Sequence, residues 1–241
     1  MTPPFVRLEL THRCNHRCRH CYLTRYCGDL DAGRLAEILA HLAPGRCRLI
    51  TLTGGEPTLR DDFAALYEQA AAVAPVYLMT NGTQLADRPE IVAVLRRRPP
   101  AAVQVPLYAA TPAVHDAITG TPGSFGRALA GLEALADAGL PTVVEMLVFR
   151  HTRNDVATVR DLAGERGARF RLATIIHPRR DGNTDNREGA LEPAEAVDLA
   201  ARYPEAIGPC SLAAGAATPP AALCVHIGPD GRPIGGRDAE R

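Results

Sequence analysis

Apolar, β-branched runs alternate with longer amphipathic stretches along most of this chain of 241 residues, and this alternation limits its possible folds most strongly. Each apolar run has the length of a buried strand, and each amphipathic stretch has the period of a helix. Such a repeat favours a parallel sheet, because a crossover helix must return the chain to the same end of the sheet. We therefore predict an α/β fold with about six βα units.

The predicted strands are Val6–Thr11, Arg48–Thr53, Val76–Thr80, Ala102–Leu107, Thr142–Phe149 and Phe170–Ile176. The predicted helices are Ala32–His41, Asp62–Ala74, Pro89–Arg97, Ser124–Ala138, Asp155–Arg166 and Pro193–Arg202. These units are too few for a closed eight-stranded barrel, which predicts an open, partial (β/α)6 TIM-like barrel with its site at the C-terminal strand ends. Residues 1–203 are expected to form this barrel, and residues 204–241 a short irregular C-terminal tail.

The balance of charges excludes some classes of partner. The chain has 27 Lys and Arg against 27 Asp and Glu, which favours neither nucleic acid nor a membrane surface as a partner. No apolar run is long enough to span a bilayer, and the N-terminus lacks a signal-peptide pattern. We therefore expect a cytoplasmic protein. Seven cysteines, three of them within eight positions, suit metal ligation in a reducing compartment better than disulfides.

Those three cysteines, Cys14, Cys18 and Cys21, follow the first predicted strand with C-x3-C-x2-C spacing. Three thiolates on one loop can hold three irons of a four-iron cluster and leave the fourth iron open to another ligand. The alternative is a structural zinc site, with a nearby histidine or Cys27 as the fourth ligand. Structural zinc usually takes two spaced pairs of ligands, so the clustered trio favours the iron–sulfur cluster.

Two further motifs fall at strand ends. Gly54 and Gly55 let the backbone approach a ligand closely, and their carbonyls, with the Glu56 carboxylate, would form an acceptor-rich pocket for an ammonium group. The alternative is an ordinary βα turn. Asn81 stands in a turn-forming Asn-Gly pair after the third predicted strand.

The cysteine motif, the Gly-Gly-Glu turn and the Asn-Gly turn together resemble the signature of the radical S-adenosylmethionine (SAM) enzymes. The stretch Val103–Asp116 resembles the peptide and cofactor maturases of that superfamily. The resemblance covers roughly Phe5 to Arg180. It implies a [4Fe-4S] cluster on Cys14, Cys18 and Cys21 whose open iron binds SAM. Reductive cleavage of SAM would then yield a 5′-deoxyadenosyl radical that abstracts hydrogen from a substrate.

The resemblance also implies which residues contact SAM: His20, Gly54, Gly55, Glu56, Asn81, Gln104 and Arg127. His20 would pack near the adenine and Arg127 would meet the carboxylate. Gln104 would share the ribose contact, or else line the barrel as a polar group. The family often has a serine at the position of Pro106, and because proline cannot donate, we expect the fourth strand to be bulged or to end early.

Other polar residues are interpreted from their positions. His115 and Asp116 could form an acid–base pair, but a helix cap beside a surface histidine is favoured. Glu145 is a charge in an apolar run, and burying it unpaired would cost several kcal/mol, so we expect it to face the barrel interior and a ligand. The loop residues Arg179, Arg180 and Asp181 are expected to face the substrate mouth.

The tail looks like the start of an extension of the SPASM type that binds further clusters. Val225–Gly231 carries this likeness, but the cysteine expected next is Gly236 here. Cys210 and Cys224 are too few to hold an auxiliary four-iron cluster, so we interpret the tail as a shortened remnant. The thiols expected to be buried and structural are Cys27 and Cys47.

The resemblance implies a ribosomal peptide or a small biosynthetic intermediate as substrate, and an electron donor such as flavodoxin or ferredoxin. One alternative is a radical SAM dehydratase or decarboxylase of sugars or nucleosides. Another is a non-catalytic partner protein that binds the cluster or SAM, which Pro106 and the short tail leave open.

Overall fold

One parallel sheet of seven strands organises the computed structural model, which describes residues 5–24, 28–42, 47–207 and 224–234. The strands stand in the order β6-β5-β4-β3-β2-β1-β7. Their bounds are β1 Phe5–Thr11, β2 Leu49–Gly54, β3 Val76–Met79, β4 Ala102–Pro106, β5 Thr142–Leu147, β6 Arg169–Ala173 and β7 Cys224–Ile227. The expected open, barrel-like α/β fold is confirmed.

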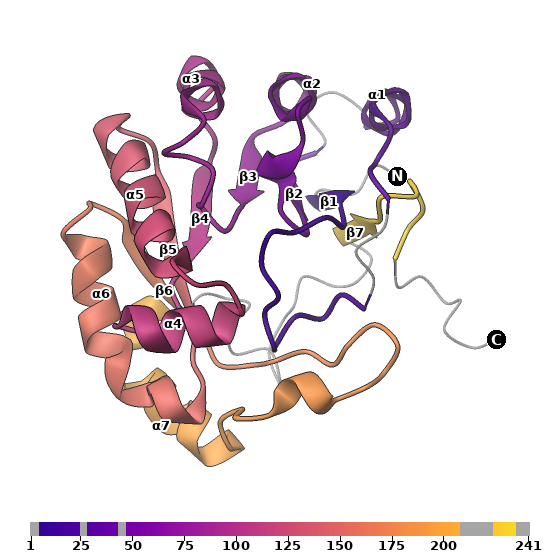
Figure 1. Cartoon of the computed structure of the whole chain (residues 1–241). Coiled ribbons are helices and arrows are strands. Elements are labelled where there is room, and N and C mark those ends of the chain that lie inside the picture. The colour runs from indigo at the N-terminus through magenta and orange to yellow at the C-terminus, as the bar shows by residue number, and fades with distance from the viewer. Residues whose placement is uncertain (1–4, 25–27, 43–46, 208–223, 235–241) are drawn as a thin grey trace.

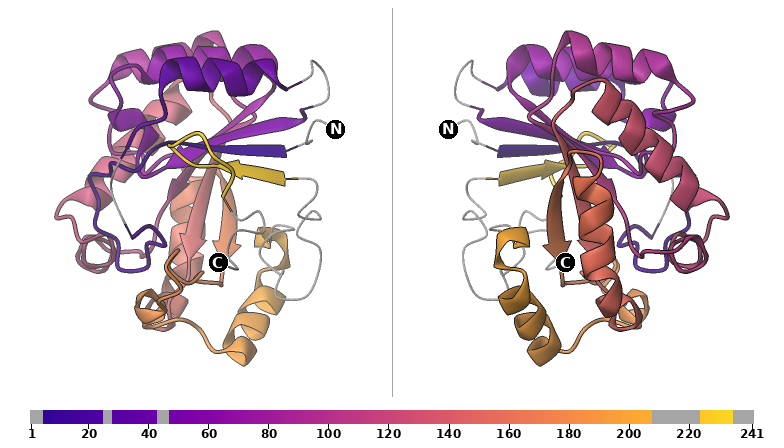
Figure 2. Two further views of the ribbon diagram at one scale, coloured as in Figure 1. Left: turned by 90° about the vertical axis from the view of Figure 1, so that its right-hand side faces the viewer. Right: turned by 90° about the vertical axis from the view of Figure 1, so that its left-hand side faces the viewer.

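Helices cover the outer side of the curved sheet, where α1, α2 and α3 form one row (Figures 1 and 2). The helices are α1 Ala32–Ala40, α2 Phe63–Val73, α3 Pro89–Arg97, α4 Pro112–Thr119, α5 Ser124–Asp137, α6 Val156–Gly164 and α7 Pro193–Arg202. Short 3-10 turns are η1 Pro57–Leu59, η2 Arg150–Asp155, η3 Asp185–Arg187 and η4 Pro204–Ala206.

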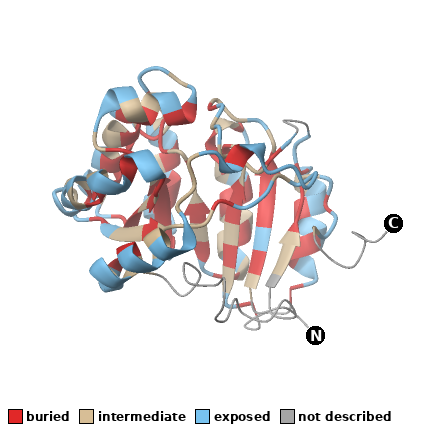
Figure 3. Ribbon diagram, turned by 90° about the horizontal axis from the view of Figure 1, so that it is seen from below, coloured by how far each residue is buried: buried red, intermediate tan, exposed pale blue. Residues whose placement is uncertain are grey.

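The strands divide their side chains between the core and the barrel interior, because successive residues point to opposite faces. On β1, Val6, Leu8 and Leu10 belong to the hydrophobic core and are at most 2% exposed, while Arg7 lines the interior cavity. Buried and more exposed residues alternate along the strands in Figure 3. Each fully buried aliphatic side chain contributes about 1.5–3 kcal/mol to stability, so this outer face holds the fold together.

The predicted βα units are all present, with shorter strands than expected at the ends of β5 and β6. β4 ends at Pro106, which has no N–H to donate, one residue before the predicted end. Its register with β5 shows no shift, so the strand is not bulged there. The chain then continues with a hydrogen bond from the Leu107 N–H to the Glu145 carbonyl at 3.0 Å.

Helix α4 and strand β7 are absent from the predicted elements. For α4, Pro112 at its start and Gly120 after its end are typical helix boundaries. Strand β7 pairs in parallel with β1, from Phe5 opposite Cys224 to Leu8 opposite Ile227. The sequence did not predict this strand, because only two apolar residues, Val225 and Ile227, follow an alternating pattern there. So short a pattern cannot be distinguished from a loop.

The described residues beyond position 203 join the sheet of the barrel at its two edges. Ile207 forms a bridge with Leu172 of β6, and β7 extends the sheet beyond β1. The SPASM-like character of the tail is not confirmed, and Cys210 and Gly236 lie outside the described residues. Within the described part of the chain, no helix has both the length and the apolar character needed to cross a membrane.

Candidate active site

Cys14, Cys18 and Cys21 line one cavity of about 390 Å³ inside the barrel, at the C-terminal ends of the strands. We call residues 12–22 the cysteine loop. All three cysteines have free thiols and are partly exposed, whereas Cys47 is a buried core residue as expected. Cys27 lies outside the described residues.

Burial controls the protonation of the thiols. It raises the pKa of Cys14 to about 12, and a 3.4 Å hydrogen bond from the His16 N–H to Cys14 Sγ offsets only part of that effect. Burial also raises the pKa of Cys18. Both thiols are therefore protonated at neutral pH without metal, and metal binding must displace their protons.

The two glycines of the Gly-Gly-Glu turn make room for the cysteine loop. A Cβ at Gly54 would lie 2.2 Å from the Thr11 carbonyl oxygen, and one at Gly55 would lie 2.2 Å from that of Arg13. Two hydrogen bonds of 2.7 Å join the two backbones. The Gly55 N–H donates to the Thr11 carbonyl, and the Glu56 N–H donates to the Arg13 carbonyl. The glycines thus allow the backbones of β2 and the cysteine loop to touch, in addition to lining the cavity.

The Glu56 carboxylate is fully buried behind the cavity wall. It accepts hydrogen bonds from the N–H and hydroxyl of Thr58, from the Thr80 hydroxyl and from the Asn81 N–H. Burial raises the pKa of Glu56, and these hydrogen bonds act in the opposite direction. The side chain thus braces the ends of β2 and β3, and the glycines and Asn81 present the surface of this corner to the cavity.

The Asn-Gly turn holds the cysteine loop from the side of β3. Asn81 Nδ2 donates to Asn15 Oδ1 at 2.7 Å, and Asn15 Nδ2 donates to the Thr83 hydroxyl at 2.9 Å. Asn15 was not singled out from the sequence. Its position between two cluster cysteines is the only signal that could have indicated it.

Helix α4 holds the opposite side of the cysteine loop. The Arg17 N–H donates to the Thr119 carbonyl at 2.8 Å, and the Arg19 N–H to that of Ile118 at 3.3 Å. The surface location expected for His115 is wrong: it is 1% exposed and packs between Tyr108 and Phe125.

Asp116 lies inside α4 and does not cap the start of its own helix, as the sequence suggested. It instead caps the following helix, α5, by accepting hydrogen bonds from the Gly123 N–H, the Ser124 hydroxyl and the Phe125 N–H. The acid–base pair with His115 therefore finds no support, because each side chain is engaged by a different part of the framework.

His20 forms an aromatic wall of the cavity. Its ring centroid lies 4.7 Å from that of Tyr108 and 5.4 Å from that of Phe149, two contacts that the sequence did not suggest. Burial lowers the pKa of His20 to about 4, so the ring is neutral. Its Nδ1 and the Nε2 of His16 are buried without a hydrogen-bond partner among the described residues. Unsatisfied buried nitrogens on a cavity wall are suited to a polar ligand.

The interior floor carries a polar network. Gln104 accepts hydrogen bonds from the Tyr77 hydroxyl at 2.8 Å and from Arg171 at 2.6 Å, and it donates to Glu145 at 2.8 Å. Glu145 also pairs with Arg171. Glu145 therefore faces the barrel interior as expected, and Gln104 lines it. Arg171 was missed, although Arg169 and Arg171 alternate with apolar residues on β6.

The structure does not bring Arg127 into the cavity wall. Its Nη2 donates to the Pro122 carbonyl at 3.3 Å, at the start of α5. Glu56, another predicted SAM contact, is fully buried and does not line the cavity. The remaining candidates, His20, Gly54, Gly55, Asn81 and Gln104, share the cavity with the three cysteines. Across the described ranges, no three Cys, His, Asp or Glu side chains are placed to hold a single metal ion.

Fold and site together define an open parallel α/β barrel with a cysteine-lined cofactor cavity at its C-terminal strand ends. The family model described as "Radical SAM superfamily" matches residues 8–163, and the chain belongs to this superfamily. A [4Fe-4S] cluster and SAM are the cofactors of the superfamily. Three free thiols and unsatisfied nitrogens on one cavity fit such a pair of ligands.

Curated relatives are enzymes by name. Mycofactocin maturase MftC of Mycobacterium ulcerans (strain Agy99) is 34% identical over 178 residues, covering 72% of this chain and 47% of that protein. The PqqA peptide cyclase of Ruegeria pomeroyi is 32% identical over 210 residues, covering 83% of this chain and 54% of that protein. The AdoMet-dependent heme synthase of Methanosarcina barkeri is 33% identical over 172 residues, with shares of 69% and 48%. The chain thus spans about half the length of the curated relatives it matches.

Solved structures show the same fold. SuiB of Streptococcus suis, bound to its precursor peptide SuiA, superposes with a TM-score of 0.72 at 16% identity, covering 85% of this chain and 46% of SuiB. SuiB bound to S-adenosylmethionine gives a TM-score of 0.68 at 14% identity, with shares of 85% and 44%.

Proposed function

We propose that this chain is the catalytic barrel of a radical SAM enzyme that abstracts hydrogen from a ribosomal peptide or a small biosynthetic intermediate. The observation that carries the proposal is the convergence of Cys14, Cys18 and Cys21 with the glycine turn in one cavity. When bound and reduced, the cluster supplies the electron that cleaves SAM. The cysteine loop, braced from β2, β3 and α4, would hold that cluster.

The protein's own task is to orient SAM and exclude water. The carbonyls of Gly54 and Gly55 would accept the amino group of SAM. The neutral His20 ring and Tyr108 would pack against the adenine, an aromatic contact of about 1 kcal/mol. Asn81 and Gln104 would meet the polar groups of the ribose and methionine parts. Arg127 could reach a carboxylate only after its side chain leaves Pro122.

The floor of the cavity indicates the polarity of the substrate. Arg7 and Arg171 both line it, together with the single carboxylate Glu145, which is already paired with Arg171. Arg7 therefore remains the basic group best placed to meet an acidic substrate group. A peptide with a carboxylate would fit this surface, and peptide maturases and cyclases are among the relatives.

The proposal is tested by anaerobic reconstitution with iron and sulfide, followed by SAM and dithionite. We expect about four irons per chain and formation of 5′-deoxyadenosine. Single Cys→Ser variants at positions 14, 18 and 21 should each lose the cluster and SAM cleavage. Cys47→Ala is the matched control, because it removes a core thiol outside the cavity and should retain the cluster.

Other results would reassign the chain. Zinc in place of iron would contradict the proposal, and about eight irons would contradict the interpretation of the tail. A four-iron cluster without SAM cleavage would favour a non-catalytic partner protein. Further parts of the proposal are a cytoplasmic location and a flavodoxin or ferredoxin as electron donor, which should replace dithionite in the same assay.

A further inference from the structure

The loop after β6 folds back onto the cysteine loop. We call residues 174–187 the β6 loop; its first residues, Thr174 to Ile176, line the cavity. Three of its groups then donate hydrogen bonds to consecutive carbonyls of the cysteine loop. Asn186 Nδ2 donates to His20 O at 3.2 Å, Arg179 Nη1 to Cys21 O at 3.0 Å and the Arg180 N–H to Tyr22 O at 3.0 Å.

This placement differs from the sequence prediction, in which Arg179 and Arg180 face the substrate mouth. Both guanidinium groups instead turn toward the cysteine loop and the end of β1. The reason is that several groups at that end can only accept hydrogen bonds: the loop carbonyls and the buried Glu9 carboxylate. Two arginines supply many donors in a fixed geometry, which suits such a cluster of acceptors.

Arg179 is oriented by Asp185. Its Nε donates to Asp185 Oδ1 at 2.6 Å, and its Nη2 lies 3.5 Å from the Arg19 carbonyl. The Arg179 side chain is only 24% exposed, whereas that of Asp185 is 60% exposed. Water therefore screens the Asp185 charge more effectively, and the positive charge is directed at the backbone of Cys21.

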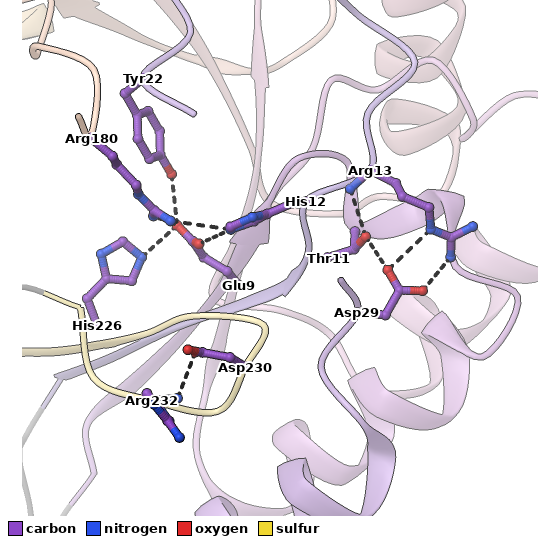
Figure 4. Close-up of polar contacts among 10 residues, drawn as sticks. All are labelled: Glu9, Thr11, His12, Arg13, Tyr22, Asp29, Arg180, His226, Asp230 and Arg232. Carbon is purple, nitrogen blue, oxygen red and sulfur yellow. Dashed lines mark hydrogen bonds and ion pairs between the residues drawn. The ribbon is translucent and has the colours of Figure 1, made fainter. Parts of the chain in front are cut away.

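Arg180 fixes the neighbouring part of the β6 loop. Its guanidinium pairs with the fully buried Glu9 carboxylate and lies 5.1 Å from the centre of the Tyr22 ring. Figure 4 shows Tyr22, His12 and His226 gathered around the same carboxylate. Because Arg180 anchors the loop through this pair and its N–H donates to the Tyr22 carbonyl, the backbone at the adjacent Arg179 is held beside the cysteine loop.

From these contacts we infer that Arg179 is a positioning residue for the iron–sulfur cluster: it fixes the backbone of Cys21 and favours the reduced state of the cluster by its charge. The inference rests on the proposed function. Reduction adds an electron to an already anionic group, and a cation within hydrogen-bond distance of a ligand residue stabilises that added charge. Net charge and hydrogen bonds near the sulfurs are known determinants of cluster potentials.

The test measures the cluster itself. Arg179→Gln and Arg179→Lys are reconstituted beside the wild type, folding is checked by circular dichroism, iron is counted, and the midpoint potential is determined by redox titration with electron paramagnetic resonance. We expect Arg179→Gln to have a lower potential, with about a tenfold smaller ratio of reduced to oxidised cluster at a fixed potential, which is 59 mV for one electron. Arg179→Lys keeps the charge and should stay near the wild-type potential.

Arg97→Gln is the matched control. Arg97 lies on α3, and its guanidinium pairs with Glu68 of α2 at an exposed position. It should keep the wild-type iron content and potential. Loss of iron from folded Arg179→Gln, with iron retained in Arg97→Gln, would support the positioning role. An unchanged iron content and potential in Arg179→Gln would overturn the inference, as would equal shifts in both glutamine variants. If the wild type itself binds no four-iron cluster, the proposed function fails instead.

Discussion

The Glu9 carboxylate accepts a hydrogen bond from His226 Nε2 at 2.9 Å, and this contact joins the first strand, β1, to the last, β7. The same carboxylate accepts hydrogen bonds from His12, Tyr22 and Arg180, so one buried group holds four segments of the chain (Figure 4). Burial acts to raise the pKa of Glu9, but the hydrogen bonds from His12, His226 and Arg180 outweigh it and hold the pKa well below its usual range.

Glu9→Gln should lower the free energy of unfolding at pH 7 by about 2–4 kcal/mol, because Arg180 loses its buried counter-charge. A carboxyl with a lowered folded-state pKa stabilises the protein above its ordinary pKa of 4.5, and this contribution is lost as the pH falls toward the folded-state value. The difference between wild type and variant should therefore shrink below about pH 5. Urea denaturation across that range measures it. Glu37→Gln, at an exposed ion pair with Arg34, should change stability by less than about 1 kcal/mol.

Gly55→Ala should displace the cysteine loop. The new Cβ would lie 2.2 Å from the Arg13 carbonyl oxygen, a backbone atom that cannot move alone. We expect a loss of about 1–3 kcal/mol in stability and a reduced iron content after reconstitution. Gly126→Ala, in a helix with open space around the new methyl group, should instead gain about 0.5–1 kcal/mol and bind normal iron. Normal iron in both variants would contradict the packing role of Gly55.

Asp116→Ala removes the cap of α5 and should cost about 1–2 kcal/mol. The Gly123 and Phe125 N–H groups would lose the acceptor that they share. The loss of stability is measured by thermal unfolding of the wild type and the variant. Asp137→Ala, at the exposed C-terminal end of the same helix, should be neutral or slightly stabilising, because a negative charge is unfavourable there. Equal effects of the two substitutions would argue against a specific cap.

Gln104→Leu should weaken SAM binding without changing the iron–sulfur cluster. The position lines the cavity without contacting the cysteine loop, so iron content should stay at the wild-type level. SAM affinity should fall about tenfold, or about 1.4 kcal/mol, if Gln104 meets the ribose. Equilibrium dialysis with reconstituted protein provides the dissociation constants. Tyr77→Phe removes only the hydroxyl that donates to Gln104, so it measures the loosening of the network alone.

Much of the site could be predicted because its residues are local in the sequence. Cys14, Cys18 and Cys21 share one short loop, and the glycine and Asn-Gly turns follow predicted strands whose ends must meet in a parallel sheet. The interior position of Glu145 followed from the energetic cost of a lone carboxylate in an apolar strand. These inferences needed only strand order and side-chain chemistry.

The errors concern residues whose surroundings come from other elements of the fold. His115 has the sequence pattern of a surface helix residue, but Tyr108 and Phe125 enclose it. Arg179 and Arg180 stand in a polar loop, and only the fold shows that their partners are Cys21 and Glu9, about 160 residues or more away in the sequence.

The sequence alone therefore determined the βα order and the cysteine motif, because periodicity and spacing act over a few residues. The tertiary structure decided how the cysteine loop is held, since its partners come from β2, β3, α4 and the β6 loop. It also decided that a short alternating segment becomes β7, through pairing with β1. Such contacts form between strand edges and buried acceptors that are far apart in the sequence, and a local sequence pattern does not show which of them come together in the fold.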